Sequence, residues 1–251
     1  MREQPCGCIE IVNRKLLPRL HLTAGKKLSE QIYEFLRMQI VKRQIPPGTA
    51  LSENELAAHF DVSRNPIREA IGRLRNNHLI EIMPQKGTFV TKISISNLKD
   101  ICFVRGALET AAVRNIPNLT EKEFFAVIKA LDKNMAQQRK QQTGKAENSS
   151  RFLELDDEFH KIICDLSKTS LSWQMIHSVK ANMDRVRYLS LSHVTTVSEL
   201  SQCHEEIYEA IAAKNIEKAC ELIEKHSYEI TRTYKQIMEE SSEDWFEETE
   251  N

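Results

Sequence analysis

An aspartate and a histidine lie four positions apart in the segment Asp156-Asp-Glu-Phe-His160. On a helix this spacing places both side chains on one face, where a carboxylate and an imidazole can share a metal ion. His204 and His226 follow later in the chain, each among apolar residues that recur with helical spacing. Because inward-facing histidines on separate helices can converge on one point, these four residues form a candidate metal site.

The same histidines have a simpler interpretation. Taken singly, a histidine among apolar residues is more often a hydrogen-bonded core residue than a metal ligand. Three histidines and one carboxylate in an all-helical region strengthen the metal interpretation, but spacing alone leaves both open. A set of imidazoles and one carboxylate suits a divalent ion; we expect zinc, with nickel, iron or manganese as alternatives.

A second group of chemically active residues lies in a predicted pair of short helices. Ser52 and Glu55 form a capping box that predicts a helix starting at Ser52, and Ser63 is placed to cap the next helix. Apolar residues at helical spacing form the inner face of the second helix. Its outer face carries Arg64, Arg68, Arg73 and Arg75. This pattern indicates a helix-turn-helix whose second helix enters the DNA major groove.

An ordinary helical hairpin with solvated arginines would share these features, so the flanking segments matter. An amphipathic helix precedes the pair and ends before Ile45-Pro-Pro-Gly48. Two β-rich runs, residues 79–84 and 88–93, follow it on either side of Gln85-Lys-Gly87. The order of three helices and a two-stranded wing favours a DNA-binding domain.

Charge divides the chain in the same way. Residues 1–92 hold 15 Lys and Arg against 9 Asp and Glu, a net charge of +6, whereas the remaining 20 basic and 27 acidic residues give −7. A basic module supplies the counterion release that dominates DNA affinity, and an acidic one does not hold a polyanion. The excess is modest, so tight binding predicts two copies of the module and hence a homodimer on a two-fold operator.

Three segments carry a family resemblance: Pro47-Gly-Thr-Ala-Leu-Ser-Glu-Asn-Glu-Leu-Ala57, Val62-Ser-Arg-Asn-Pro-Ile-Arg-Glu-Ala70 and Gln85-Lys-Gly-Thr-Phe-Val90. They resemble the winged-helix domain of the GntR family of bacterial transcription regulators. The resemblance implies that Arg64, Arg68 and Gly87 meet DNA. Asn65 stands where many members have threonine or glutamine. The DNA-binding residues we expect are Ser63, Arg64, Asn65, Arg68, Arg73, Lys86 and Gly87.

Beyond the wing, every periodic segment is helical. Helices are predicted from Ser96 to Arg114, from the capping box Thr120-x-x-Glu123 to about residue 135, and near 151–167, 171–191, 198–213 and 216–240. The predicted fold class is therefore mainly α, a winged helix-turn-helix followed by an all-helical bundle. The expected domains are an extension over 1–25, the winged helix over 26–93, a helical metal-binding, ligand-binding and dimerisation domain over 94–240, and an acidic tail over 241–251, which Trp245 and Phe246 could pin to a neighbouring surface.

The helical part has its own resemblance. Asp156-x-x-Phe-His160, His204-x-x-Ile-x-x-Ala-Ile211 and Ala219-x-x-x-Ile-x-x-His226 are similar to three signature segments of the FCD domain, the effector domain of FadR-type GntR regulators. Members with this set hold a divalent metal with one aspartate and three histidines. The resemblance implies that Asp156, His160, His204 and His226 are the metal ligands, and it argues against a lipid effector.

A metal with vacant positions could bind a small carboxylate, for example a sugar acid. Arg105, Arg185 and Arg187 could clamp its far end with bidentate charge-assisted bonds. Their positions resemble those that face the pocket in the family. The alternative is an ordinary salt bridge, and Arg105 with Glu109 at i+4 is an obvious pair.

These patterns together predict a DNA-binding regulator, most simply a repressor, that responds to a carboxylate at a metal centre and is not an enzyme. A pure metal sensor is the first alternative, and a metalloenzyme the second. No apolar run spans a bilayer and no signal peptide is evident, so we expect a soluble cytoplasmic protein without a membrane partner. Reduced, mostly buried thiols are expected for the six cysteines; Cys6-x-Cys8 is only half of a possible metal site.

Overall fold

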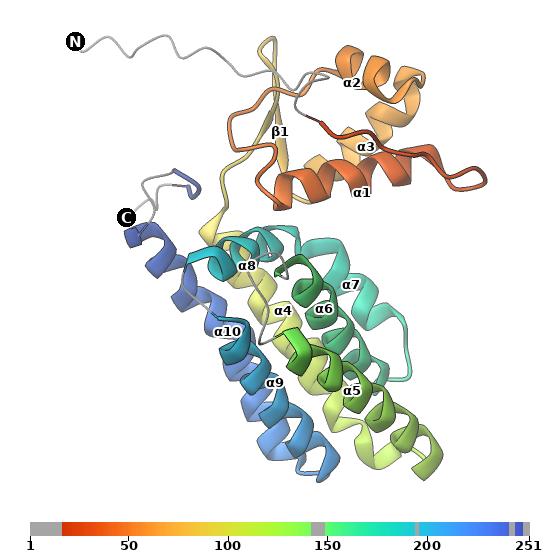
Figure 1. The fold of residues 1–251 in the computed structure, drawn as a ribbon, viewed down its shortest axis with the longest axis vertical. Coiled ribbons are helices and arrows are strands. Elements are labelled where there is room, and N and C mark those ends of the chain that lie inside the picture. The colour runs from red at the N-terminus through yellow and green to blue at the C-terminus, as the bar shows by residue number, and fades with distance from the viewer. Residues whose placement is uncertain (1–16, 142–148, 194–195, 241–243, 248–251) are drawn as a thin grey trace. The chain divides into compact units, whose positions relative to one another are not determined.

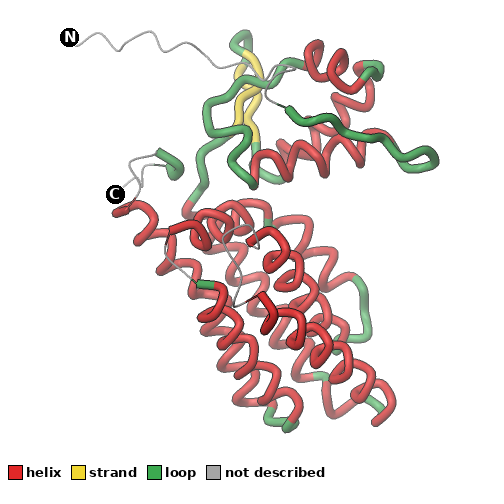
Figure 2. Tube along the Cα trace, in the orientation of Figure 1, coloured by secondary structure: helices red, strands yellow, loops and turns green. Residues whose placement is uncertain are grey.

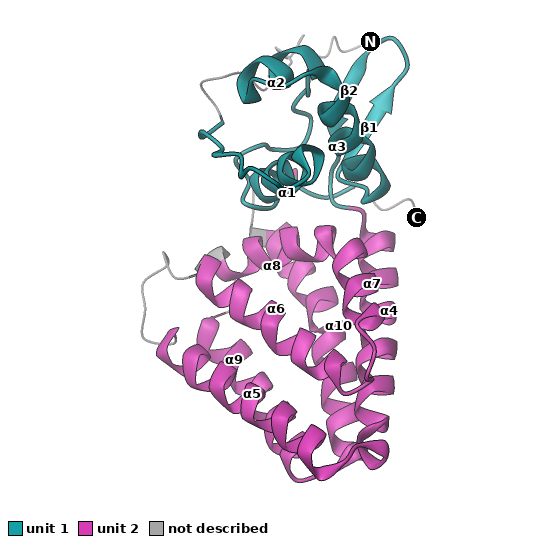
Figure 3. Cartoon of the chain, turned by 90° about the vertical axis from the view of Figure 1, so that its right-hand side faces the viewer, with its two compact units in different colours: residues 1–93, 245–251 teal, residues 94–244 magenta. Residues whose placement is uncertain are grey.

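A computed structural model describes residues 17–141, 149–193, 196–240 and 244–247. The chain divides into two compact units, residues 1–93 with 245–251, and residues 94–244 (Figure 3). Within the described ranges, no helix is long and apolar enough to cross a membrane. Cys6 and Cys8 lie outside these ranges, whereas Cys102, Cys164 and Cys220 are buried free thiols.

The first unit contains the predicted three helices and wing. Its elements are α1 (Leu28–Val41), α2 (Glu53–Phe60), α3 (Arg64–Asn76), β1 (Ile80–Met83) and β2 (Gly87–Val90). The two strands are antiparallel, with Ile80 opposite Val90 and Met83 opposite Gly87 (Figure 2). Gly87 has a φ of 124°, a conformation that side chains disfavour, so glycine suits the wing turn.

Helix capping explains how α2 and α3 meet. Ser52 caps α2 as predicted, because its hydroxyl accepts the backbone N–H of Glu55 at 3.4 Å. Asp61 ends α2 in the left-handed conformation, with φ of 52°. Ser63 occupies the N-cap position of α3 as predicted, but its side chain makes no capping hydrogen bond. The turn between the helices therefore depends on the conformation of Asp61 more than on a capping bond at Ser63.

The end of the chain belongs to the DNA-binding unit. Trp245 and Phe246 are buried, and residues 245–251 are grouped with the first unit. The N–H of Ile93 donates to the carbonyl of Trp245 at 2.8 Å, and the N–H of Glu247 donates to the carbonyl of Ile93 at 3.1 Å, which makes a parallel bridge. The guanidinium of Arg43 lies 4.7 Å from the centre of the Trp245 ring. These residues pack as part of the core of that unit.

The second unit is a helical bundle with a short 3-10 turn. Its elements are α4 (Ile95–Arg114), η1 (Ile116–Asn118), α5 (Glu121–Gln141), α6 (Ser149–Asp165), α7 (Leu171–Val179), α8 (Ala181–His193), α9 (Val197–Ala212) and α10 (Ile216–Glu240). Helix α10 packs along α4 and also contacts α8 and α9, while α5 packs on α6 and α9 (Figure 1). A continuous apolar core that includes Phe159, Ile163, Ile207 and Ile223 joins α6, α9 and α10.

Three sequence predictions within this unit need correction. Helix α4 begins two residues before the predicted start, because the hydroxyl of Ser94 rather than Ser96 caps it. Helix α5 continues past residue 135 to Gln141, since polar Gln138 is fully buried in a hydrogen-bonded network. The single helix expected over 171–191 is two helices that break at Lys180, whose ammonium is drawn between the carboxylates of Asp157 and Asp184.

Candidate metal centre and DNA interface

The four predicted ligands converge in the second unit. Asp156 and His160 lie one turn apart on α6, His204 comes from α9, and His226 from α10. One ligand atom from each residue lies within 4.8 Å of all the others. The side chains of Asp156, His160 and His204 are almost completely buried. The helical spacing and the shared core of the three helices therefore bring a carboxylate and three imidazoles to one point.

The distances fit a single metal ion. Nε2 of His226 lies 3.3 Å from Nε2 of His204 and 3.3 Å from Nε2 of His160. Oδ1 of Asp156 lies 3.4 Å from Nε2 of His204 and 3.9 Å from Nε2 of His160. Ligands at metal–ligand distances of 2.0–2.1 Å in a tetrahedron stand roughly 3.4 Å apart. The chemistry and the separations of the donor set both suit a divalent transition metal.

Two neighbouring side chains orient the histidines. Nδ1 of His160 lies 3.0 Å from a carboxylate oxygen of Glu109, and Nδ1 of His204 lies 2.8 Å from the amide oxygen of Gln138. Because both oxygens are acceptors, each Nδ1 carries the proton, and each Nε2 presents its lone pair to the cluster. The Nδ1 of His226 has no hydrogen-bond partner among the described residues.

The environment keeps the three imidazoles neutral. Burial, followed by the positive charge of Arg105, holds the pKa of His160 well below its usual range. Burial and Arg187 do the same to the pKa of His204, and burial and His204 to that of His226. Neutral imidazole is the form that binds metal, so these histidines need not lose a proton at neutral pH before they coordinate an ion.

The predicted effector arginines differ in their surroundings. Arg105 pairs through Nε with Glu109 at 2.9 Å, and its Nη2 contacts Nε2 of His160. Arg187 contacts the second carboxylate oxygen of Asp156 through Nη2. Arg185 is also buried, and its Nη1 donates to the amide oxygen of Asn182 at 3.2 Å. Burial lowers the pKa of Arg185 to about 10.

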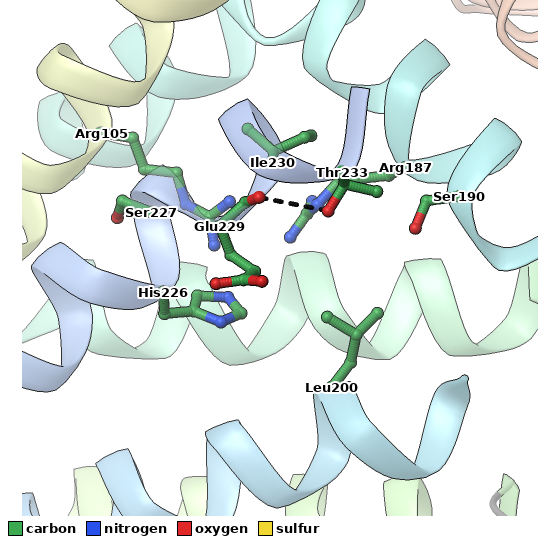
Figure 4. A pocket seen from close by; sticks show the side chains of 9 residues that line it. All are labelled: Arg105, Arg187, Ser190, Leu200, His226, Ser227, Glu229, Ile230 and Thr233. Carbon is green, nitrogen blue, oxygen red and sulfur yellow. Dashed lines mark hydrogen bonds between the residues drawn. The ribbon is translucent and has the colours of Figure 1, made fainter. Parts of the chain in front are cut away.

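A pocket opens beside the histidines (Figure 4). Two of the three predicted arginines, Arg105 and Arg187, line it, and Arg185 is not among its lining residues. The remaining lining residues are His226, three hydroxyl residues, two aliphatic residues and one acid: Ser190, Ser227, Thr233, Leu200, Ile230 and Glu229. The hydroxyl of Ser227 is buried and has no hydrogen-bond partner among the described residues. Two cations with nearby hydroxyls are suited to a small hydroxylated anion.

The first unit presents most of the predicted DNA contacts at its surface. The exposed residues are Ser63, Arg64, Asn65 and Arg68 on or before α3, and Lys86 and Gly87 in the wing turn. Nε of Arg68 donates to a carboxylate oxygen of Glu53 at 2.9 Å. This ion pair is itself exposed, so Arg68 can exchange Glu53 for DNA at little cost.

Arg73 is placed differently from the other arginines of α3. Its guanidinium lies 3.9 Å from the centre of the Tyr33 ring on α1. It also lies 3.7 Å from Glu30 and 4.0 Å from Glu34, both on α1. These contacts favour a role in packing α3 on α1, and DNA contact by Arg73 stays a prediction.

Sequence reasoning did not find the residues that support the metal ligands. Glu109 was considered only as an ion-pair partner of Arg105, and Gln138 was assigned to a frayed helix end. The relevant signal was present in Glu109, because an acidic residue on the inner face of an amphipathic helix needs a buried partner. Gln138 offered no such signal, since a polar residue near a helix end is normally solvated.

Comparison with known proteins agrees with this architecture. Residues 20–90 match the family described as bacterial regulatory proteins, gntR family, and residues 100–228 match the FCD domain. The HTH-type transcriptional repressor RspR of Escherichia coli K12 is 37% identical over 228 residues, which cover 90% of this chain and 97% of RspR. A regulator from Streptomyces ambofaciens is 30% identical and covers 81% of this chain and 84% of its own.

Solved structures share the fold. E. coli McbR/YncC superposes with a TM-score of 0.64 at 21% identity, covering 84% of this chain and 99% of its own. A GntR regulator from Rhodococcus sp. RHA1 gives 0.62 at 24% identity, covering 86% and 100%. The matched families are transcriptional regulators rather than enzymes. The chain therefore belongs to the GntR family of DNA-binding transcriptional regulators, with an FCD domain following its winged helix.

Proposed function

We propose that this regulator is a repressor whose operator binding responds to a small carboxylate held at a divalent metal. The observation that carries the proposal is the position of Asp156, His160, His204 and His226, whose ligand atoms lie within 4.8 Å of one another beside a pocket lined by Arg105 and Arg187. Zinc suits the ligand separations, and nickel, iron or manganese would also accept this ligand set. The relative RspR is named a repressor, which supports the same direction of control.

The metal supplies a Lewis acid to which one carboxylate of the effector binds. The residues of the chain determine which acid is accepted. Arg187, already beside Asp156, can bind a second carboxylate or hydroxyl group, and the unpartnered hydroxyl of Ser227 offers a further hydrogen bond. Leu200 and Ile230 limit the space for polar substituents. A sugar acid has the matching combination of a carboxylate and several hydroxyl groups.

The proposed regulator acts as a homodimer on double-stranded operator DNA, in the bacterial cytoplasm where that DNA lies. An apolar patch on the second unit supports self-association, because a monomer seldom exposes several large apolar side chains together. Phe103 is exposed on α4, and Leu171, Met175 and Val179 are exposed along one face of α7, which packs against α4. Two copies would match the two halves of a palindromic operator.

The proposal is tested by operator binding with a fluorescent DNA that covers the promoter upstream of this gene. Affinity is measured for protein without metal, with zinc, and with zinc plus a panel of sugar acids. We expect metal alone to leave operator affinity largely unchanged and one acid with metal to weaken it. A full response to metal alone would support the metal sensor instead, and a response to acid without metal would rule out the metal-centred mechanism.

A further inference from the structure

His160 offers a single lone pair to its surroundings, and Arg105 occupies it. The Nδ1 proton of His160 is donated to Glu109, so its Nε2 can only accept. Nη2 of Arg105 contacts this same Nε2. The arginine therefore holds the lone pair that a metal ion at the cluster would require.

The rest of Arg105 is anchored in a way that lets its end move. Nε of Arg105 donates to Glu109 at 2.9 Å, a buried charge-assisted bond between groups of opposite charge. Nη1 contacts only the thioether sulfur of Met183, at 3.3 Å, which is a weak acceptor. Rotation about the Nε anchor can therefore release the two Nη groups from His160 without loss of the Glu109 pair. Arg105 already lines the pocket, so the released groups have a place to go (Figure 4).

Charge determines what would follow metal binding. With neutral histidines, the cations Arg105 and Arg187 balance the anions Glu109 and Asp156, and all four residues are buried or nearly so. A divalent ion adds two positive charges to this balanced site. Excess buried charge is costly unless it is paired, so the loaded site favours an anion in the adjacent pocket.

Arg187 does not compete with the metal in the same way. It contacts one carboxylate oxygen of Asp156, and the other oxygen lies 3.4 Å from Nε2 of His204. Asp156 can therefore bind a metal through one oxygen while Arg187 keeps the other. The competition is confined to Arg105.

We propose that Arg105 and the metal compete for Nε2 of His160, so that metal binding turns the Arg105 guanidinium into the pocket and completes the anion site. This inference rests on the proposed metal centre and adds an order to it: metal binds first, and the acid binds to the loaded protein. Because coupling between two ligands is reciprocal, the acid also tightens the metal.

The deciding variant is Arg105→Lys, titrated with Co²⁺ against a competing chelator. A lysine keeps a cation beside Glu109 but lacks the Nη groups that reach His160. Since a charge-assisted hydrogen bond is no longer lost when metal enters, Co²⁺ affinity is expected to rise about tenfold. Arg114→Lys is the matched control, because Arg114 is an exposed residue of the same helix, and it should bind as the wild type does. Equal or weaker binding by Arg105→Lys would overturn the competition.

Thermal melting checks that Arg105→Lys folds. If it does not, the double variant Arg105→Met with Glu109→Gln removes the ion pair as a unit and is expected to show the same rise in Co²⁺ affinity. If the wild type itself fails to bind Co²⁺ or Zn²⁺, the metal centre is wrong, which is a different result from equal affinities in wild type and variant.

A second measurement follows the guanidinium directly. The Nε–H resonance of Arg105 in a ¹⁵N spectrum is assigned by its absence from Arg105→Lys. On addition of Zn²⁺ it should remain protected by Glu109 while its chemical shift changes. An unchanged shift in protein shown to be saturated with Zn²⁺ would contradict the displacement.

Discussion

Arginine serves the two units of this regulator in opposite ways. Arg64 and Arg68 of the DNA-binding unit are exposed, and the side chain of Arg68 is 58% accessible beside Glu53. Arg105 of the second unit is 5% accessible and its partner Glu109 is fully buried. Exposed charges act weakly and over distance in a salt-dependent way, whereas buried ones act strongly on a neighbour in fixed geometry. The exposed set suits a polyanion of variable sequence, and the buried set suits one small anion.

The histidines sharpen this difference. His59 of the DNA-binding unit contacts the carbonyl of Pro18 at 3.4 Å, near the limit for a hydrogen bond. His160 and His204 of the second unit are each held by a buried acceptor at 3.0 Å or less. Oriented side chains of this kind bind an ion without further ordering, so the loss of entropy on binding is small.

The largest effect is expected from removing two metal ligands. His204→Ala combined with His226→Ala should reduce metal affinity by more than about 100-fold, because even changes behind the ligands commonly cost 10- to 100-fold. Elemental analysis of purified protein measures the metal content. Operator affinity without acid should persist, since the DNA-binding unit has its own core. His21→Ala, at an exposed position, is the control. Full metal content in the double variant would disprove the four-ligand site.

The next largest effect concerns the chain end. Trp245→Ala should destabilise the DNA-binding unit by about 3 to 5 kcal/mol, the usual loss for a large buried aromatic residue. Guanidinium denaturation, followed by a probe in each unit, measures this, and metal affinity should not change. Trp173→Ala, on α7, is the reciprocal control and should leave the DNA-binding unit intact. A Trp245→Ala variant with unaltered unfolding would show that the chain end contributes little.

A smaller effect is expected at the DNA surface. Arg68→Ala should weaken specific operator binding by about 1 to 3 kcal/mol if it reads a base. Its exposed pair with Glu53 adds little to stability, so folding should be unaffected. Titrations on operator and on random DNA separate base reading from phosphate contact, because an equal loss on both indicates phosphate alone. Arg151→Ala, an exposed arginine of the second unit, should alter neither titration.

The most gradual effect is on pH dependence. The pKa values of His160, His204 and His226 are held below the ordinary value by burial, so the unfolded chain takes up protons first as pH falls. Stability of the metal-free protein is therefore full above about pH 6.5 and is lost below it, by up to about 1.4 kcal/mol per pH unit for each histidine. Denaturation between pH 5 and pH 7.5 measures the slope. A slope unchanged in His204→Ala would show that His204 is not buried in neutral form.

Much of this architecture was predictable because local signals were consistent. Capping at Ser52 and Thr120, the wing turn at Gly87 and the 3.6-residue apolar period each acted within a few residues. The four candidate ligands could be named for the same reason, since Asp156 and His160 share a helix face. That His204 and His226 approach them depends on how α9 and α10 pack, and no local spacing encodes this; the family resemblance supplied it.

The missed features are all tertiary. The break at Lys180 has no glycine or proline to mark it, and it coincides with the bonds from its ammonium to Asp157 and Asp184. Arg73 resembles its neighbours on α3 in sequence, yet the ring of Tyr33 on another helix determines its position. Gln138 was read as solvated because burial of an amide depends on a partner far along the chain, here His204.

The burial of Trp245 in the DNA-binding unit has a consequence for synthesis of the protein. A ribosome makes residues 28–93 first, but the strand-like bridge between Ile93 and Phe246 cannot form until the whole helical unit has been translated. During that interval the nascent winged helix lacks two of its buried aromatic side chains. Nascent chains stalled before Trp245 should therefore present a less stable DNA-binding unit than released protein, so that full DNA-binding competence arises only in chains that already carry the domain that regulates it.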